Sequence, residues 1–318
     1  MARLSSKLLK NTFIERKYPL TSTIKNGIFQ PFKKVVGIIM HSDFLQDEKL
    51  AQLEKDAFQA IQRIFPCEEN LLDSIPLEQI INHYKKDILP SEKPFLIRVA
   101  GQSGSGKSSQ IVPALQHSLK QKQYIKINVG AFAPFHPNYK EIQEKTPNQM
   151  REKTNGFALK ALVMFYKHCI LNKVNLVLDM TLLEPEIDLY LMALAKKMEY
   201  KIQMHLLCVP KKVSNHFIYL RQKQTGRYVS PKSSDYFFDA LAPCLKALTH
   251  SHLFDNQDTL ILWTYFLSNP IKITHLNNSY ACRILEKYRG INVGTKNQNE
   301  LLKAKREWMS LLLRRLET

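Results

Sequence analysis

The stretch FLIRVAGQSGSGKSS, residues 95–109, combines an apolar run with a loop rich in glycine and serine. Its first six residues, 95–100, form a short apolar run that is typical of a buried strand. The next eight residues fit the Walker A pattern, and a helix is expected to begin near Lys107. A strand, a glycine-rich loop and a helix in this order predict a phosphate-binding loop.

Each residue type in this loop suits the binding of a nucleoside triphosphate. Glycines let backbone N–H groups approach phosphate oxygens with no Cβ in the way, and the positive end of the helix faces the same anion. We expect Lys107 to reach the β and γ oxygens, and the Ser108 hydroxyl to take a place on Mg²⁺. The predicted nucleotide-binding residues are Gly101, Gln102, Ser103, Gly104, Ser105, Gly106, Lys107, Ser108 and Ser109.

The glycine content argues against a chance match. The chain of 318 residues has only ten glycines, and three of them fall within these eight positions. The alternative is a plain glycine-serine turn. The motif itself indicates phosphate binding rather than one activity, because motors, GTPases and kinases share it. No Asn-Lys-x-Asp guanine-recognition sequence is present, which disfavours a GTPase switch.

Strand-like and helix-like segments alternate along the chain. Apolar runs predict strands at 95–100, 124–128, 174–180, 201–209 and 259–266, and helical spacing predicts helices at 45–65, 76–88, 149–171, 185–198, 210–224 and 231–249. This alternation predicts an α/β fold with a doubly wound parallel sheet of the P-loop kinase type.

We divide the sequence into three regions. Residues 1–90 form a basic N-terminal arm followed by helices, and residues 91–267 form the nucleotide-binding, kinase-like domain. Residues 268–318 form a basic tail with a C-terminal helix expected at 299–316. The fold is therefore expected to carry an extra helical segment before the core and a helix after it.

The charge of the chain is strongly positive. It has 46 Lys and Arg against 28 Asp and Glu, a net charge of +18. Basic residues outnumber acidic ones by eight to one in residues 1–36 and by ten to four in residues 268–318. Such a surface favours anionic partners such as nucleotides, nucleic acid, anionic lipid or an acidic protein, and a plain basic surface is equally compatible with the count.

Five scattered cysteines favour a reducing compartment. Their number is odd and no two have the close spacing of a zinc pair, so we expect free core thiols in a cytoplasmic protein. No apolar run approaches the ~20 residues that a membrane span needs, and the first residues lack the apolar stretch of a secretory signal.

Further side chains are candidates for chemistry. Asp179 ends a predicted strand, where a carboxylate can meet Mg²⁺, a water or a substrate hydroxyl, or simply cap a helix. Arg221 and Arg227 flank a glycine-containing stretch after a helix, and they either clamp a transferring phosphate or lie on a solvated basic face. His136 lies in a proline-containing loop and is either a substrate contact or a residue with no role.

Taken together, these features resemble the zeta-toxin family of P-loop kinases over residues 95–255. The resemblance depends on the order and spacing of six segments. They are GQSGSGKSS (101–109), INVGAFAPFHPNY (127–139), LVLDMT (176–181), CVPKKVS (208–214), YLRQ (219–222) and GRYVSPKSSD (226–235).

The resemblance implies an activity and roles for residues. Members of the family use ATP or GTP with Mg²⁺ to phosphorylate a hydroxyl of a UDP-activated amino sugar, and an antitoxin protein neutralises them. By position, catalytic roles are implied for Lys107, Asp179, Arg221 and Arg227, the two arginines standing at the family's transition-state positions. Substrate contacts are implied for Asn128, His136 and Thr181.

The sequence departs from the family pattern at the catalytic base. Gly130 stands where the family has its aspartate, and Leu183 stands where an arginine is common. Glycine cannot accept a proton, and one general base is worth about 10²–10⁴-fold in rate. Phosphoryl transfer depends mainly on positioning and charge stabilisation, so transfer can survive the change, with Asp179 as the expected substitute.

Three functions remain open at this point. The first is a kinase that acts on a small anionic substrate such as a UDP-amino sugar. The second, suggested by Gly130, is a degenerate protein that holds a nucleotide without transferring phosphate. The third, suggested by the charge of +18, is a kinase or ATPase associated with nucleic acid, and it ranks last because no aromatic-rich recognition module is visible. The same charge fits an acidic antitoxin as a protein partner.

Overall fold

The computed structural model describes residues 47–67, 74–119, 122–207, 209, 211–225, 229–251, 253–254, 258–263 and 271–273. The predicted tail helix at 299–316, the basic arm and Arg227 lie outside the described residues. These residues all belong to one compact unit of the chain.

A single sheet forms the centre of the described structure. Its strand order is β2-β3-β1-β4-β5-β6, and the first five strands in this order run parallel. The strands are β1 (Phe95–Gly101), β2 (Ile125–Ile127), β3 (Leu176–Asp179), β4 (Lys201–Leu207), β5 (Thr259–Trp263) and β6 (Ile271–Ile273). The predicted parallel α/β sheet is confirmed.

The edge strand β6 differs from the prediction. It pairs antiparallel with β5, in a region for which we expected only a helical tail. Residues 264–270 are too few for the crossover of about a dozen residues that a parallel neighbour would need, so the chain can return only as an antiparallel strand.

Helices cover both faces of the sheet. They are α2 (Asp47–Ile64), α4 (Leu77–Tyr84), α5 (Val112–Ser118), α6 (Val129–Phe132), α7 (Tyr139–Lys145), α8 (Met150–Leu171), α9 (Pro185–Lys197), α10 (Lys211–Thr225), α11 (Pro231–Asp239) and α12 (Leu241–His250). The helical pattern at 231–249 therefore forms two helices. The short helices α6 and α7 were not predicted, because four and seven residues give too little periodicity to detect.

The alternation of side chains along β1 explains why helices cover both faces of the sheet. Ile97 and Val99 point to one face, where they join a buried cluster with Val112 and Leu115 of α5. Arg98 points to the opposite face, toward α9. Successive side chains of a strand point to opposite faces, so a strand that is buried on both faces has its two sides covered by different helices.

Helix α2 packs on the same side as α9, although it lies far from α9 in sequence. Its buried residues Leu53, Ala57, Ala60 and Ile61 recur at helical spacing and form one face. Ion pairs also join it to its neighbours, among them Glu54 with Lys167 of α8 at 2.8 Å and Asp47 with Lys197 of α9.

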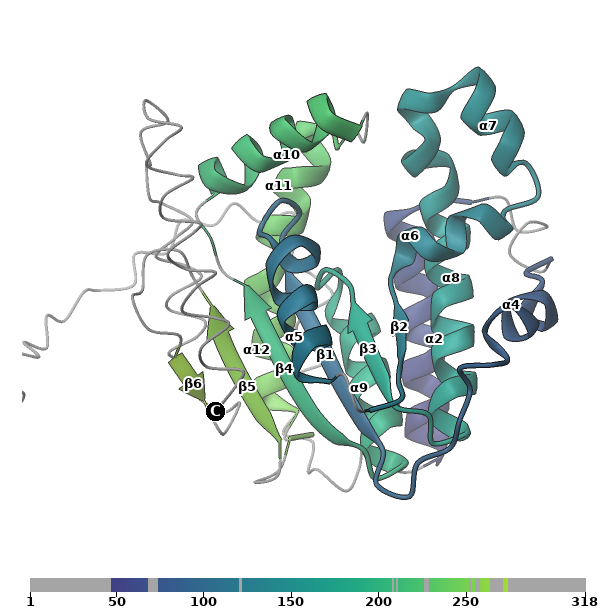
Figure 1. The fold of residues 1–318 in the computed structure, drawn as a ribbon, viewed down its shortest axis with the longest axis vertical. Helices are drawn as coiled ribbons and strands as arrows, with labels where there is room; N and C mark the ends of the chain where they lie inside the picture. Colours follow the sequence, from purple (N-terminus) through teal and green to yellow (C-terminus); the bar gives the residue numbers. More distant parts are fainter. Residues whose placement is uncertain are drawn as a thin grey trace, which may run out of the picture. The chain divides into compact units, whose positions relative to one another are not determined.

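The carboxyl ends of the parallel strands meet at one edge of the sheet. In Figure 1, helices α10 and α11 stand above one part of this edge, and α6 and α7 stand above the other. After β1 the chain forms β2 and β3 on one side of β1, and it then crosses over to form β4 on the other side of β1. Ligands of open α/β sheets bind at such a switch point, just beyond the carboxyl ends of the strands.

The described cysteines are free thiols, with Cys169 and Cys244 buried and Cys67 half-buried. Burial raises the pKa of Cys169 to about 12, so its thiol stays protonated and unreactive. Cys208 and Cys282 lie outside the described residues. None of the helices described combines the length and the apolar character that crossing a membrane requires.

Candidate nucleotide-binding site

The loop after β1 has the backbone that a phosphate-binding loop requires. Gly101, Gly104 and Gly106 all have φ in the left-handed region, at +140°, +75° and +101°. A Cβ at Gly104 would lie 2.3 Å from the carbonyl oxygen of Ser214, so only glycine fits there. The loop can therefore turn tightly beneath the first turns of α10.

Gln102 and Ser105 hold this loop in place. The Gln102 amide Nε2 donates to the carbonyl of Val209, in the connection from β4 to α10, and at 3.4 Å to the hydroxyl of Ser214 in the first turn of α10. The Ser105 backbone N–H donates to the carbonyl of Gln102 at 3.2 Å, which closes the turn. Ser103 and Ser105 are buried, whereas Ser108 and Ser109 are exposed.

Lys107 lies over the loop that it follows. Its Nζ donates to the carbonyls of Gly101 and Gln102, at 2.6 and 3.0 Å. Lys107–Ile111 forms one turn of π-helix that leads into α5, and turns of this kind occur often at functional sites. The ammonium group is thus within reach of any anion that the loop binds.

Ser108 and Asp179 bring two separate segments together. The Ser108 hydroxyl donates to Asp179 Oδ2 at 2.7 Å, although the residues are 71 positions apart. Asp179 is the last residue of β3, is paired in register with Val99 of β1, and is only 6% exposed. This contact lies at the switch point between β1 and β3.

The oxygens of Ser108 and Asp179 fit the implied magnesium ion. Mg²⁺ takes oxygen ligands, commonly one or two protein groups together with phosphates and waters. Within the described part of the chain, no cluster of three or more His, Cys, Asp or Glu side chains is arranged to hold a metal on its own. A hydroxyl beside one carboxylate therefore suits a metal that the nucleotide helps to hold.

Asn128 and Gly130 follow the neighbouring strand β2. Ile127 of β2 is in register with Leu178 of β3, so Asn128 lies level with Asp179 at the same edge. The Asn128 side chain accepts a hydrogen bond from the Ala131 N–H at 3.2 Å and caps α6. Gly130 is exposed, and a Cβ there would contact only Asn128 Oδ1, at 3.3 Å.

His136 lies in the turn between α6 and α7. It is 4% exposed, its Nδ1 accepts a hydrogen bond from the Asn138 N–H at 3.1 Å, and its ring meets Phe157 of α8 edge-on. Burial lowers the pKa of His136, so the ring is neutral at pH 7 and an accepting Nδ1 leaves the proton on Nε2. These contacts give His136 a role in packing the turn against α8.

Arg221 lies on α10, one helical turn after Ile218, which packs against Gly104 of the loop. Its Nε and Nη2 atoms are buried. The structure therefore places this arginine on the helix that covers the phosphate-binding loop. Its predicted companion Arg227 lies outside the described residues.

Thr181 lies in an irregular loop, residues 180–184, between β3 and α9. Arg98 of β1 supports this loop from below: its Nη1 donates to the Met180 carbonyl at 2.7 Å, and its Nη2 lies 3.4 Å from the Thr181 carbonyl. The same Nη2 lies 2.7 Å from Asp188 of α9, and both side chains of this ion pair are 1% exposed. Burial raises the pKa of Asp188, and the Arg98 guanidinium opposes that shift.

Sequence reasoning missed Arg98. The only available signal was one charged residue inside the apolar run FLIRVA, because a buried charge almost always has a partner. The identity of that partner, 90 positions away, could not be read from the sequence.

The fold and the loop define this protein as an α/β protein of the P-loop kinase type. The Zeta toxin family model matches residues 80–264, more than half of the chain. The chain belongs to the Zeta toxin family.

Two relatives are similar to parts of this chain. The toxin PezT of Streptococcus pneumoniae serotype 4 (strain ATCC BAA-334 / TIGR4) is 27% identical over 128 residues, which cover 39% of this chain and 48% of PezT. The chain therefore matches about half the length of this curated relative. A solved structure from the PezAT chromosomal toxin-antitoxin system of Streptococcus pneumoniae covers 75% of this chain and 96% of its own, at 19% identity and a TM-score of 0.58. At that identity, the match shows a shared fold.

Proposed function

We propose that this protein is a kinase that transfers the γ-phosphoryl group of ATP or GTP, with Mg²⁺, to a hydroxyl of a small anionic substrate such as a UDP-amino sugar. The observation that carries the proposal is the 2.7 Å hydrogen bond between Ser108 and Asp179 at the mouth of the glycine loop. It brings a hydroxyl and a carboxylate together beside Lys107, where the γ-phosphate of a loop-bound nucleotide would lie.

We assign a role to each group of the candidate site. The backbone N–H groups of the glycine loop bind the phosphates, and Lys107 exchanges its bonds to the Gly101 and Gln102 carbonyls for bonds to phosphate oxygens. Ser108 and Asp179 hold the magnesium ion, which when bound offsets the negative charge of the triphosphate. Arg221, which lies on α10, and Arg227 are the residues proposed to stabilise the charge that develops on the transferring group.

In the reaction, the substrate hydroxyl oxygen forms a bond to the γ-phosphorus while the bond from that phosphorus to the β–γ bridging oxygen breaks. The hydroxyl proton leaves for solvent or for a nearby base, and a nucleoside diphosphate is released. Asn128, level with Asp179, Thr181, two residues after it, and the neutral ring of His136 are the proposed contacts for the acceptor.

A second candidate, a nucleotide-binding protein without transfer activity, is favoured by Gly130. The residue is exposed at the edge that carries Asn128, and it offers no group to accept a proton. Because Asp179 accepts a hydrogen bond from Ser108, we assign it to the metal rather than to the acceptor proton. We still favour the kinase, since phosphoryl transfer depends chiefly on positioning and charge stabilisation.

One experiment separates the two candidates. The full chain is incubated with γ-labelled ATP or GTP, Mg²⁺ and a panel of UDP-sugars, and the acceptors are analysed for labelled phosphate, with Lys107→Ala in parallel. Labelled acceptor made by the wild type and not by Lys107→Ala supports the kinase. Nucleotide binding by calorimetry with no labelled acceptor from any sugar supports the binding protein.

A protein partner is also proposed. The solved relative comes from a toxin-antitoxin system, and this chain has a net charge of +18. We propose an acidic antitoxin that covers the nucleotide site, because complementary charge steers association. Induced expression of this chain without that partner should then slow the growth of a host, and Lys107→Ala should not. Equal growth inhibition by both forms would contradict the proposal.

A further inference from the structure

The loop at residues 180–184, which carries Thr181, is joined by backbone hydrogen bonds to β1 and α9 at its two ends and is held by distant side chains between them. Besides the bonds from Arg98 to the Met180 and Thr181 carbonyls, the Tyr236 hydroxyl lies 3.2 Å from the Leu183 carbonyl. Three of the five carbonyls in this loop therefore lie within hydrogen-bond distance of donors on distant side chains. An irregular loop beside a site stays in one conformation only when such contacts hold it.

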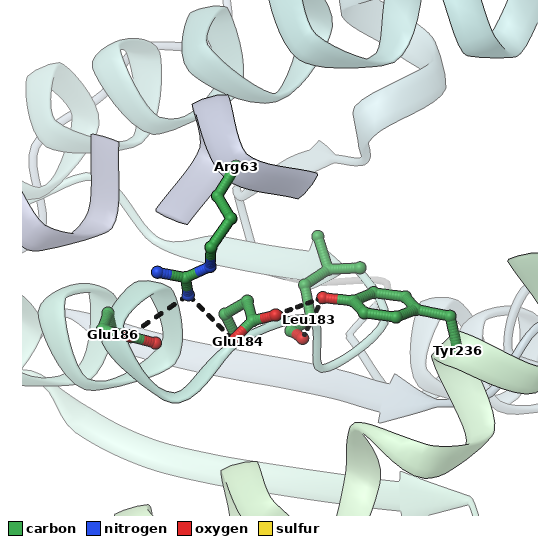
Figure 2. Close-up of polar contacts among 5 residues, drawn as sticks. All are labelled: Arg63, Leu183, Glu184, Glu186 and Tyr236. Atoms are coloured by element: carbon green, nitrogen blue, oxygen red, sulfur yellow. Dashed lines mark hydrogen bonds and ion pairs between the residues drawn. The ribbon is translucent and has the colours of Figure 1, made fainter. Parts of the chain in front are cut away.

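Glu184, the last residue of the loop, is held from two directions. As Figure 2 shows, its Oε1 accepts a hydrogen bond from Tyr236 of α11, and its Oε2 lies 3.1 Å from Arg63 Nη2 of α2. The same Arg63 nitrogen lies 3.2 Å from Glu186 in the first turn of α9. Tyr236 and Glu184 are both largely shielded from water, which strengthens the contact between them.

Glu184 occupies the capping position of α9, but its side chain does not cap the helix. A side chain at this position usually caps the first helical N–H groups. The carboxylate instead bridges two helices that come from opposite ends of the described chain. Burial and the nearby carboxylate raise the pKa of Tyr236, so its hydroxyl stays protonated and acts as the donor.

Helix α11 is also tied to the helix that covers the glycine loop. The Ser234 hydroxyl donates to Asn215 Oδ1 of α10 at 2.7 Å, next to Ser214, which contacts Gln102 and Gly104. A continuous chain of contacts thus runs from the glycine loop through α10 and α11 to Tyr236, Glu184 and the loop that carries Thr181.

We propose that Glu184, held by Tyr236 and Arg63, is a positioning residue that sets the acceptor-binding loop relative to the arginine-bearing helix α10. The inference rests on the proposed function, because Thr181 and Arg221 take their roles from it. Loss of the Tyr236 contact should let the 180–184 loop shift while the glycine loop, held by its own bonds to Ser214 and Val209, stays in place.

The test compares two tyrosines that each donate to a backbone carbonyl. Tyr236→Phe removes the bonds to Leu183 and Glu184, whereas Tyr200→Phe removes a 2.8 Å bond to the Val174 carbonyl, which precedes the opposite end of β3. Both changes remove only a hydroxyl. We expect Tyr236→Phe and Glu184→Ala to lower kcat/KM for the acceptor by about tenfold or more, mainly through KM, since small misplacements have large kinetic effects. Nucleotide affinity should stay within twofold of the wild type.

Amide hydrogen exchange gives a readout that needs no turnover. We expect faster exchange in the 180–184 segment of Tyr236→Phe, and no such change there in Tyr200→Phe. Arg63→Lys, which keeps the charge, should retain more acceptor affinity than Arg63→Met. The inference is overturned if Tyr236→Phe has the same KM for the acceptor as Tyr200→Phe and the same amide exchange rate at residues 180–184. If the wild type transfers no phosphate at all, the proposed function fails while the exchange comparison still decides whether Glu184 positions the loop.

Discussion

At the scale of single residues, the site depends on a serine hydroxyl from the helical turn after the glycine loop and a carboxylate from the end of β3. Replacing Ser108 by alanine removes a proposed magnesium ligand and leaves Asp179 without this donor. We expect the Mg²⁺ concentration for half-maximal nucleotide binding to rise roughly 10–100-fold, the scale seen when a group supporting a bound metal is lost.

Magnesium titrations of nucleotide binding measure this shift. Ser118→Ala is the matched control, because Ser118 ends the same helical segment and donates only to the Leu115 carbonyl, at 2.9 Å. An unchanged magnesium requirement in Ser108→Ala would show that the hydroxyl does not serve the metal.

Gly130 gives a second prediction at this scale. Because the position is exposed and a Cβ would meet only the Asn128 side chain, Gly130→Asp should fold without strain in the surrounding core. If transfer lacks only a base, this change should raise kcat by up to about 10²–10⁴-fold. Gly130→Asn, which has the same shape and cannot take the proton, should not. Equal kcat values for the two variants would show that a base at this position does not speed the transfer.

At the scale of secondary-structure elements, the buried pair of Arg98 and Asp188 joins β1 to α9. Arg98→Met should destabilise the protein by about 3–5 kcal/mol, because Asp188 would remain buried without its partner. The double variant with Asp188→Leu should recover much of this loss, since two apolar groups leave no buried charge. Urea unfolding of the single and double variants measures the difference, and additive losses would argue against the pair as described.

The elements also show how far the sequence could predict the structure. Long amphipathic or apolar segments such as α2, α9 and β1 were predicted close to their observed bounds, because each has its own periodicity. The short elements α6, α7 and β6 were not, since a few residues carry no period and depend on their neighbours for stability.

The same distinction applies to the candidate site. The glycine loop is a local motif, so its geometry follows from residues that are adjacent in sequence. The contacts of Arg98 with Asp188 and of Tyr236 with Glu184 join ordinary residue types that are 90 and 52 positions apart. No local pattern marks such pairs, and they are found only when the fold brings them together.

At the scale of the whole molecule, a buried histidine in the sheet should make stability depend on pH. Burial lowers the pKa of His205 to about 3, whereas an unfolded histidine has a pKa of about 6.5. Below pH 6.5 the unfolded chain therefore binds a proton that the folded chain does not, so stability is lost as the pH falls.

By pH 5 the expected loss from His205 alone is about 2 kcal/mol. Unfolding of the wild type and His205→Leu by urea at pH 7 and pH 5 measures this effect, and the variant should lose less stability between the two values. The same loss in both proteins would contradict a buried, neutral His205.

Calorimetric titration of the full chain with ATP and with GTP, in the presence of Mg²⁺, shows directly whether the glycine loop binds a nucleotide. We expect saturable binding of one nucleotide per chain, weakened at least tenfold in Lys107→Ala because the ammonium group proposed to bind the phosphates is gone. Absence of binding by either nucleotide, or equal binding by the wild type and Lys107→Ala, would contradict it.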